Sequence, residues 1–331
     1  MSLRRNFFGR PQSFAFPHIT ASVFWKTFEF RSLFSLSKSI PMKLSFKIHY
    51  FLAVETFLLV SLTGFSYASN CSCGYVDDQG HVWRESIVTD FTKSSGALAA
   101  LGDDWIVSTD NEPQSGSATA NIQYIKANVL EHKSALGIQA SAHTAGSSEV
   151  HSGEIFTERS DILHGTFRMR AAVPTVPGVV FGFFSYESDS QEQDIEFLSS
   201  DDKSHQHVQY TNQPGTVNGE VDDDAYRDVD VGSANFTTYG EHRFDWLKTA
   251  TKYYYNSNLT ATITKNVPTS PSEIVLNVWS NGDPGFSQGP PKSNAVATVE
   301  YIKLYFNSTS MDEQKFSQAC SKAGHVARCK I

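Results

Sequence analysis

Ser190-Gln-Glu-Gln-Asp-Ile-Glu-Phe-Leu198 places three carboxylates, Glu192, Asp194 and Glu196, at alternate positions of one short stretch. Alternate side chains of a β-strand share a face, so the three acids point the same way and the intervening residues point the other way. Burying three acids together is costly unless they are paired. The pattern therefore predicts a strand whose acidic face lies open and has a function.

The spacing of Glu192 and Glu196 suits the hydrolysis of a glycosidic bond. Their Cα atoms are roughly 13 Å apart along a strand, and inward-leaning side chains bring the carboxyl groups toward the about 5–5.5 Å of a retaining pair. One carboxylate attacks the anomeric carbon, the other protonates the departing oxygen, and Asp194 helps to keep the two glutamates in different protonation states. A solvated acidic strand with salt-bridge partners is the alternative that this short pattern leaves open.

The chain from residue 75 onward is typical of many short strands bounded by Gly, Pro, Asn, Asp or Ser. Long helical periodicity, internal repeats and dividing linkers are absent from this sequence. The pattern predicts one all-β domain, a sandwich or jelly roll. Its clearest strands are Gly165–Val173, Val179–Tyr186, Glu273–Trp279 and Thr298–Phe306.

The longest irregular stretch is expected over residues 213–238. It contains five aspartates, namely Asp222, Asp223, Asp224, Asp228 and Asp230. A calcium loop would use several such oxygen ligands, but the spacing does not fit an EF-hand. A solvated acidic loop is the favoured interpretation.

The acidic stretch and its surroundings resemble glycoside hydrolase family 16, the lichenase and laminarinase group. That family has the motif Glu-[Ile/Leu/Val]-Asp-[Ile/Val/Ala/Phe]-Glu, which Glu192–Glu196 matches except at Gln193. The resemblance covers about residues 75–307. It is also carried by Ser152–Thr157, Gly165–Arg170, His207–Asn212, His242–Trp246, Pro268, Asn277–Trp279 and Ser280–Asp283.

The resemblance implies a concanavalin A-like jelly-roll β-sandwich of two antiparallel sheets, with a glycan cleft on its concave face. It implies that Glu192 is the nucleophile, Asp194 the assisting acid and Glu196 the general acid/base. It implies no required cofactor and no assigned metal ligand, although a structural calcium ion is compatible with the family.

Two departures from the family pattern stand out. Gln193 replaces an aliphatic residue whose side chain should point between the sheets, where an unpaired amide costs about 1–3 kcal/mol. Gln193 therefore needs a partner, or the strand is locally irregular. Tyr254-Tyr255-Asn256-Ser257 stands where the family has a late Asp-Gly hairpin.

Four residues are candidates for sugar binding, because aromatic rings stack on sugar rings and polar groups read hydroxyls. Tyr210 and Asn212 resemble cleft residues of the family, and Asn277 and Trp279 alternate on one strand and so share a face. Core packing is the competing interpretation for the two aromatic residues.

The N-terminal part of the chain differs from the rest. Residues 1–68 hold eight basic and two acidic residues, so the remaining 263 residues carry a net charge of −14 within the overall −8. Residues 42–68 have a basic start, an apolar stretch and a Ser-Tyr-Ala end, which indicates a signal peptide. Residues 1–41 form an upstream extension of undefined role, and residues 69–331 form the predicted mature domain.

The mature chain has the marks of a secreted protein. Its cysteines lie at its two ends, and cross-links between those ends are plausible in an oxidising compartment. Cys71 to Cys73 is the least favourable of the bridges because of its geometry. Four glycosylation sequons accompany them. The residues are Cys71, Cys73, Cys320 and Cys329, with sequons at Asn70, Asn235, Asn258 and Asn307.

The leading hypothesis is a secreted, retaining endo-β-glucanase, extracellular or in the cell wall, that hydrolyses β-1,3 or mixed β-1,3-1,4 glucan. A cell-wall glucan transglycosylase using the same residues and a non-catalytic glycan-binding module are the alternatives. The acidic charge argues against nucleic acid as a partner, and Glu55 interrupts the apolar stretch too early for a stable membrane anchor.

Overall fold

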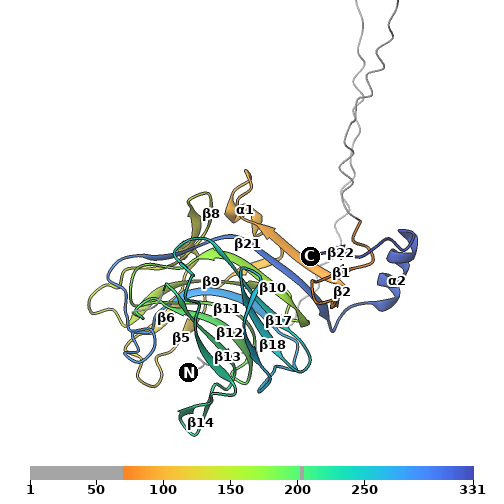
Figure 1. Ribbon diagram of the computed structural model, residues 1–331. Helices are drawn as coiled ribbons and strands as arrows, with labels where there is room; N and C mark the ends of the chain where they lie inside the picture. The colour runs from red at the N-terminus through yellow and green to blue at the C-terminus, as the bar shows by residue number, and fades with distance from the viewer. Residues whose placement is uncertain (1–69, 202–204) are drawn as a thin grey trace, which may run out of the picture. The chain divides into compact units, whose positions relative to one another are not determined.

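Two large β-sheets pack face to face in the described part of the chain (Figure 1). The computed structural model describes residues 70–201 and 205–331. The predicted extension and signal peptide lie outside these residues. We call the two layers the front sheet and the back sheet.

The front sheet carries the acidic stretch. Within the described residues it runs in the order β16-β13-β12-β11-β20-β9-β6-β5, with β4 paired to β9. Its strands are β4 (Trp105–Val107), β5 (Asn111–Glu112), β6 (Asn121–Tyr124), β9 (Glu149–Thr157), β11 (Val180–Ser188), β12 (Gln191–Leu198), β13 (His207–Asn212), β16 (Tyr226–Asp230) and β20 (Glu273–Trp279).

The back sheet runs in the order β19-β18-β17-β10-β21-β8-β7 over the described part of the chain, with β3 also paired to β21. Its strands are β3 (Glu85–Asp90), β7 (Val129–His132), β8 (Ala135–Ala140), β10 (Ile162–Ala172), β17 (Gly240–Trp246), β18 (Thr251–Tyr255), β19 (Asn258–Ile263) and β21 (Ala295–Ser308).

Smaller elements complete the described residues. They are β1 (Tyr75–Val76), β2 (Val82–Trp83) and β22 (Cys329–Lys330) in a small sheet, the hairpin β14 (Thr216–Val217) and β15 (Glu220–Val221), the 3₁₀ turn η1 (Lys126–Asn128), and the helices α1 (Ala97–Ala100) and α2 (Glu313–Lys322). No helix among them is long and apolar enough to cross a membrane.

Among the described residues, one apolar core fills the space between the two sheets. Phe181, Phe183 and Ile195 of the front sheet join Phe167 and Phe244 of the back sheet in it, and all five are fully buried. Large apolar side chains at alternate positions of facing strands form such a core because each strand buries only one of its faces. The predicted all-β sandwich is therefore confirmed.

The stretch expected to be irregular, residues 213–238, is more ordered than expected. It holds the β14–β15 hairpin, which turns at Asn218 and Gly219 with positive φ angles of 53° and 86°, and the edge strand β16. Helix α2 was also not predicted. It is ten residues long and none of them is buried, so only a short stretch of sequence could have indicated it.

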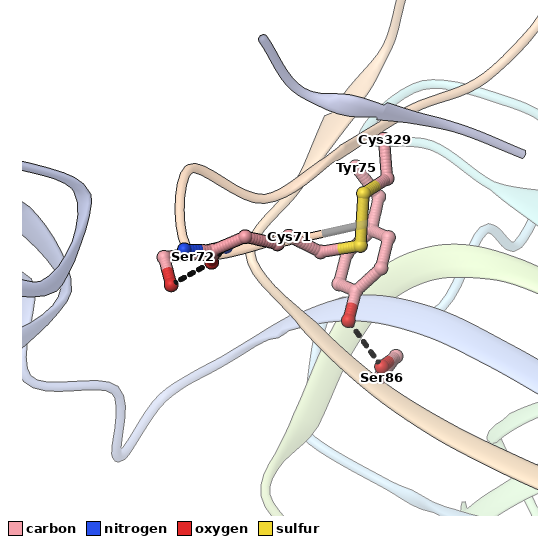
Figure 2. Close-up of a disulfide and its surroundings, with 6 residues drawn as sticks. Cys71, Ser72, Tyr75, Ser86 and Cys329 are labelled. Carbon is pink, nitrogen blue, oxygen red and sulfur yellow. Dashed lines mark hydrogen bonds between the residues drawn. A yellow bond between two sulfur atoms is a disulfide. The ribbon is translucent and has the colours of Figure 1, made fainter. Parts of the chain in front are cut away.

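Two disulfides join the ends of the described chain. Cys71 pairs with Cys329 and Cys73 with Cys320, which confirms that the cross-links run between the termini rather than from Cys71 to Cys73. Figure 2 shows the first bridge beside Tyr75, whose hydroxyl accepts a hydrogen bond from Ser86. The segment from 329 onward is thereby held as the parallel strand β22 beside β1.

The disulfides should stabilise the fold non-additively. Either bridge alone keeps the ends of the chain together. Once one bridge is formed, the other closes only the short loop made of residues 71–73 and 320–329, about thirteen residues in all. We expect Cys73→Ala/Cys320→Ala to lower the free energy of unfolding by about 3 kcal/mol, and replacement of all four cysteines to lower it by about 8 kcal/mol. Denaturant unfolding of the two variants measures this; equal losses would contradict it.

Candidate active site

The three carboxylates of β12 lie on the outer face of the front sheet. Ile195 and Phe197 belong to the core between the sheets, so the alternating acids point away from it. Glu192 and Asp194 are buried and Glu196 is half-buried. The predicted shared face of the acids is therefore what the structure shows.

Asp194 keeps its proton to a higher pH than a free aspartate does. Burial, followed by the charge of Glu192 and a hydrogen bond with it, raises the pKa of Asp194 well above that of a free aspartate, against a lowering by the Gln213 amide. The hydrogen bond with Glu192 favours the neutral form of Asp194, so in that bond Asp194 donates and Glu192 accepts. Glu192 is thereby stabilised as the acceptor.

Glu196 is also kept neutral over most of the physiological range. Burial is the main cause and the charge of Asp194 the second, and together they raise the pKa of Glu196 to about 8. A carboxyl group that retains its proton near neutral pH can donate it to a leaving group. The face thus offers an acid at Glu196 and, beside Asp194, an acceptor carboxylate at Glu192.

The reverse side of β12 is fixed by a buried hydrogen-bonded bridge between the sheets. The Gln193 side chain points inward, where its Nε2 donates to Ser185 Oγ at 3.0 Å and its Oε1 accepts from Thr251 Oγ1 at 2.6 Å. All three side chains are fully buried. The amide that departs from the family pattern has found partners on β11 and on β18 of the back sheet, so no unpaired group remains on Gln193.

A polar row crosses the outer face beside Glu196. In register, Glu196 lies opposite Gly182 on β11, Gly182 opposite Asn277 on β20, and Asn277 opposite Glu154 on β9. Asn277 Nδ2 donates to Glu154 Oε2 at 3.1 Å. A β-carbon on Gly182 would lie 2.8 Å from Asn277 Oδ1, so glycine leaves room between Glu196 and Asn277.

Apolar side chains flank this row on both sides. One cluster holds Phe184, Tyr186 and Val275, with Phe156 packed against it. The other holds Ile122, Tyr124, Val180, Leu198 and Trp279, with Phe286 packed against it. Apolar surface on either side of a few polar groups suits a sugar chain, whose rings have apolar faces and hydroxyl edges.

Comparison with known proteins identifies the family. Residues 115–303, more than half of the chain, match the model of glycosyl hydrolases family 16. The chain belongs to this family. The carboxylate strand and the polar row lie within the matched residues, whereas both disulfides lie outside them.

Two curated β-glucanases are similar to this family 16 chain in sequence. That of Bacillus subtilis (strain 168) is 32% identical over 122 residues, which cover 35% of this chain and 47% of that protein. That of Acetivibrio thermocellus is 29% identical over 174 residues, which cover 50% of this chain and 49% of that protein. The chain therefore spans about half the length of the curated relatives it matches.

Two solved structures share the fold. The Bacillus licheniformis β-glucanase superposes with a TM-score of 0.53 at 19% identity, covering 67% of this chain and 98% of that chain. A prokaryotic β-1,3-1,4-glucanase (lichenase) derived from a mouse hindgut metagenome gives 0.53 at 18% identity, covering 67% and 99%. The jelly-roll sandwich inferred from the resemblance is confirmed.

Two of the predicted sugar contacts lie behind the front sheet. Tyr210 is fully buried in the core and stacks on Tyr253, with ring centroids 4.4 Å apart. Asn212 is also fully buried, and its Nδ2 donates to the Lys265 carbonyl. The prediction that they contact sugar is corrected, because they are opposite the inward-facing Ile195 and Gln193 in register and share that face.

The other two predicted contacts lie on the face of the carboxylates. Asn277 is in the polar row, and Trp279 is opposite Val180, on the same face of β20 as Asn277. Phe286 stacks on Trp279 at a centroid distance of 6.0 Å, and Trp279 is only 7% exposed. Phe286 therefore covers part of the Trp279 ring, which was predicted to stack on a sugar.

Three further residues of the site, Gly182, Glu154 and Gln213, were not predicted from the sequence. None belongs to the five-residue motif, and they reach the site through strand pairing or, for Gln213, through the loop after β13. Of the three, Gln213 comes nearest to being predictable. It is two residues beyond Thr211, which pairs with Asp194 in register, and alternate positions share a face.

Three of the five aspartates considered for a calcium loop have other partners. Asp222 pairs with Lys265 at 2.5 Å, and His207 lies between Asp228 and Asp230. No group of three His, Cys, Asp or Glu side chains that could hold a metal ion occurs within residues 70–201 and 205–331.

Glu196 should make stability depend on pH. Its folded-state pKa is raised, so its contribution is fully present below the unfolded-state pKa and is lost as the pH rises through about 8. We expect Glu196→Gln, which cannot ionise, to gain thermal stability relative to wild type between pH 4.5 and pH 8. Melting temperatures of both proteins across that range measure the difference; a constant difference would contradict this assignment.

The Gln193 bridge should respond differently to single and triple substitution. Gln193→Leu leaves two buried hydroxyls without their partner and should lower the free energy of unfolding by about 2–3 kcal/mol. Adding Ser185→Ala and Thr251→Val removes those orphaned groups and should recover most of the loss. Urea unfolding tests this, and a triple variant weaker than the single one would refute it.

Proposed function

We propose that this family 16 protein is a retaining endo-β-glucanase acting on β-1,3 or mixed β-1,3-1,4 glucan. Glu192 serves as the nucleophile, Asp194 as the assisting acid and Glu196 as the general acid/base. The observation that carries the proposal is the pairing on one face of a proton-retaining Glu196 with a Glu192 that accepts a hydrogen bond from Asp194.

This arrangement supports a double displacement. Glu196 gives its proton to the departing glycosidic oxygen while a Glu192 oxygen bonds to the anomeric carbon, and the glucan chain departs with a new hydroxyl. Glu196, now a carboxylate, takes a proton from water, whose oxygen displaces Glu192 from the sugar. The anomeric centre is inverted twice, so its configuration is retained.

The proposed substrate is a neutral polysaccharide lying across the polar row. Asn277 is fixed by Glu154, and its Oδ1 has no hydrogen-bond partner among the described residues. A buried acceptor without a donor is costly, and a sugar hydroxyl would supply one. Asn277 and Trp279 are therefore our proposed substrate contacts.

We also propose that the protein is secreted. Its two disulfides are typical of an oxidising compartment, and Asn70, Asn235 and Asn258 of the four sequons are exposed. We expect the secreted product to begin near residue 69. N-terminal mass spectrometry measures this, and a terminus before residue 42 would contradict the assigned signal peptide.

The glycan specificity and the catalytic roles can be tested together. Wild type is incubated with laminarin, lichenan, xyloglucan and chitin oligomers, and new reducing ends are measured. We expect laminarin or lichenan to be cleaved, and Glu192→Gln and Glu196→Gln to lose at least about 1,000-fold in rate. Longer products instead of shorter ones would indicate a transglycosylase, and no product with any glycan would favour a binding module.

Rescue by azide separates the two glutamates. Azide replaces the missing nucleophile in Glu192→Ala and should give an α-glycosyl azide, whereas in Glu196→Ala it intercepts the glycosyl-enzyme and should give the β-anomer. The matched control is Glu187→Gln, an exposed glutamate of β11, which should retain wild-type activity. Activity that persists in Glu192→Gln would overturn the assigned roles.

A further inference from the structure

Gln213 contacts the central carboxylate from the loop that follows β13. Its backbone N–H donates to the Glu192 carbonyl at 3.0 Å, which places the residue beside β12. Its side-chain Nε2 donates to Asp194 Oδ2 at 2.9 Å. Gln213 therefore holds both the main chain and a side chain of the acidic strand.

The orientation of the Gln213 amide is fixed by its other end. Gln213 Oε1 accepts a hydrogen bond from the backbone N–H of Gly215 at 2.9 Å. A backbone N–H can only donate, so the oxygen of the amide has to face Gly215 and the NH₂ group has to face Asp194. The geometry thus fixes a donor on Asp194 Oδ2.

A fixed donor decides where Asp194 can carry a proton. An oxygen that receives the N–H of Gln213 cannot donate a proton back along that bond. A carbonyl oxygen also accepts a hydrogen bond better than a hydroxyl oxygen does, so the N–H on Oδ2 favours Oδ1 as the carrier of the proton in the hydrogen bond with Glu192. Without the fixed amide, both oxygens of Asp194 would be equivalent sites.

We propose that Gln213 is a positioning residue, whose clamped amide places the proton of Asp194 on Oδ1 and so directs it to Glu192. This deepens the proposed function and rests on it. With that proton in place, Glu192 receives a hydrogen bond before it attacks the sugar. Gln213 itself touches no reacting atom.

Several titratable groups surround Asp194 and would share in any change of its protonation. They are Glu192 and Glu196 on its own strand, Tyr186 on β11, Tyr226 on β16 and Tyr253 from the back sheet. Among the described residues, the Gln213 amide is the side-chain donor that lowers the pKa of Asp194. Its removal should therefore raise that pKa.

The experiment follows the titration of Asp194 directly. The full chain is expressed in a secreting host with ¹³C-carboxyl aspartate, the Asp194 signal is assigned by its loss in Asp194→Asn, and its shift is followed against pH. Gln213→Met removes both ends of the amide, and Gln213→Glu keeps the acceptor for Gly215 but removes the N–H. Both should raise the pKa of Asp194 and lower kcat on the order of tenfold with little change in KM.

A matched control distinguishes proton placement from loop support. Asn266 Nδ2 donates to the Pro214 carbonyl in the same loop without touching Asp194, and Asn266 has a positive φ of 50° that glycine tolerates. Asn266→Gly should leave the Asp194 titration and kcat unchanged.

The outcomes separate this inference from the proposed function. An unchanged Asp194 titration in both Gln213 variants, or an equal change in Asn266→Gly, would overturn the role of Gln213 even if wild type cleaves glucan. A raised pKa confined to the Gln213 variants supports the proton placement. If wild type then cleaves no glycan, the proposed function fails and the proton placement stands.

Discussion

Mutual repulsion of three carboxyl groups on one face of β12 is the constraint on which the rest of this site depends. Glu192, Asp194 and Glu196 are alternate residues of one strand, and burial makes their repulsion stronger than it would be in water. The repulsion is reduced because two of the carboxyl groups stay protonated. Asp194 shares one with Glu192, and Glu196 keeps its own up to a pKa of about 8. The different proposed roles of Glu196, as the acid, and Glu192, as the nucleophile, follow from this difference in protonation.

The reverse side of the same strand explains how such a face is held in place. Gln193 is bonded to Ser185 on a neighbouring strand and to Thr251 in the opposite sheet. Beside it, Tyr253 Oη donates to Asn212 Oδ1 at 3.1 Å, so a second buried hydrogen bond joins the two sheets under the acids. Satisfied polar groups in a core tie strands to one register. β12 is thus fixed from below by directional bonds as well as by apolar packing.

The sandwich is also stabilised by cross-links between the two ends of the described chain. The two disulfides join segments that are 258 and 247 residues apart in sequence. They lie outside the part that matches the family, residues 115–303, and hold the exposed helix α2 and the strand β22 against the N-terminal segment. This closure therefore lies outside the part of the chain that matches the family.

The sequence by itself determined the class of the fold, the strand with the acids and their common face. Alternation along a strand is a local property, so Glu192, Asp194 and Glu196 could be placed together without any knowledge of their neighbours. The same reasoning gave Asn277 and Trp279 a common face, and the positions of the cysteines indicated that the two ends are joined.

Only the tertiary structure decided which face each strand turns outward and what lies beside it. Alternation cannot say whether Tyr210 points to the carboxylates or to the core, because a shift of register by one residue exchanges the two faces. Pairing with Ile195 settled it. Gly182 and Glu154 join the row of Glu196 across hydrogen-bonded strands, and Gln213 reaches Asp194 through a loop. Such contacts depend on strand order and on loop path, which are properties of the folded chain as a whole.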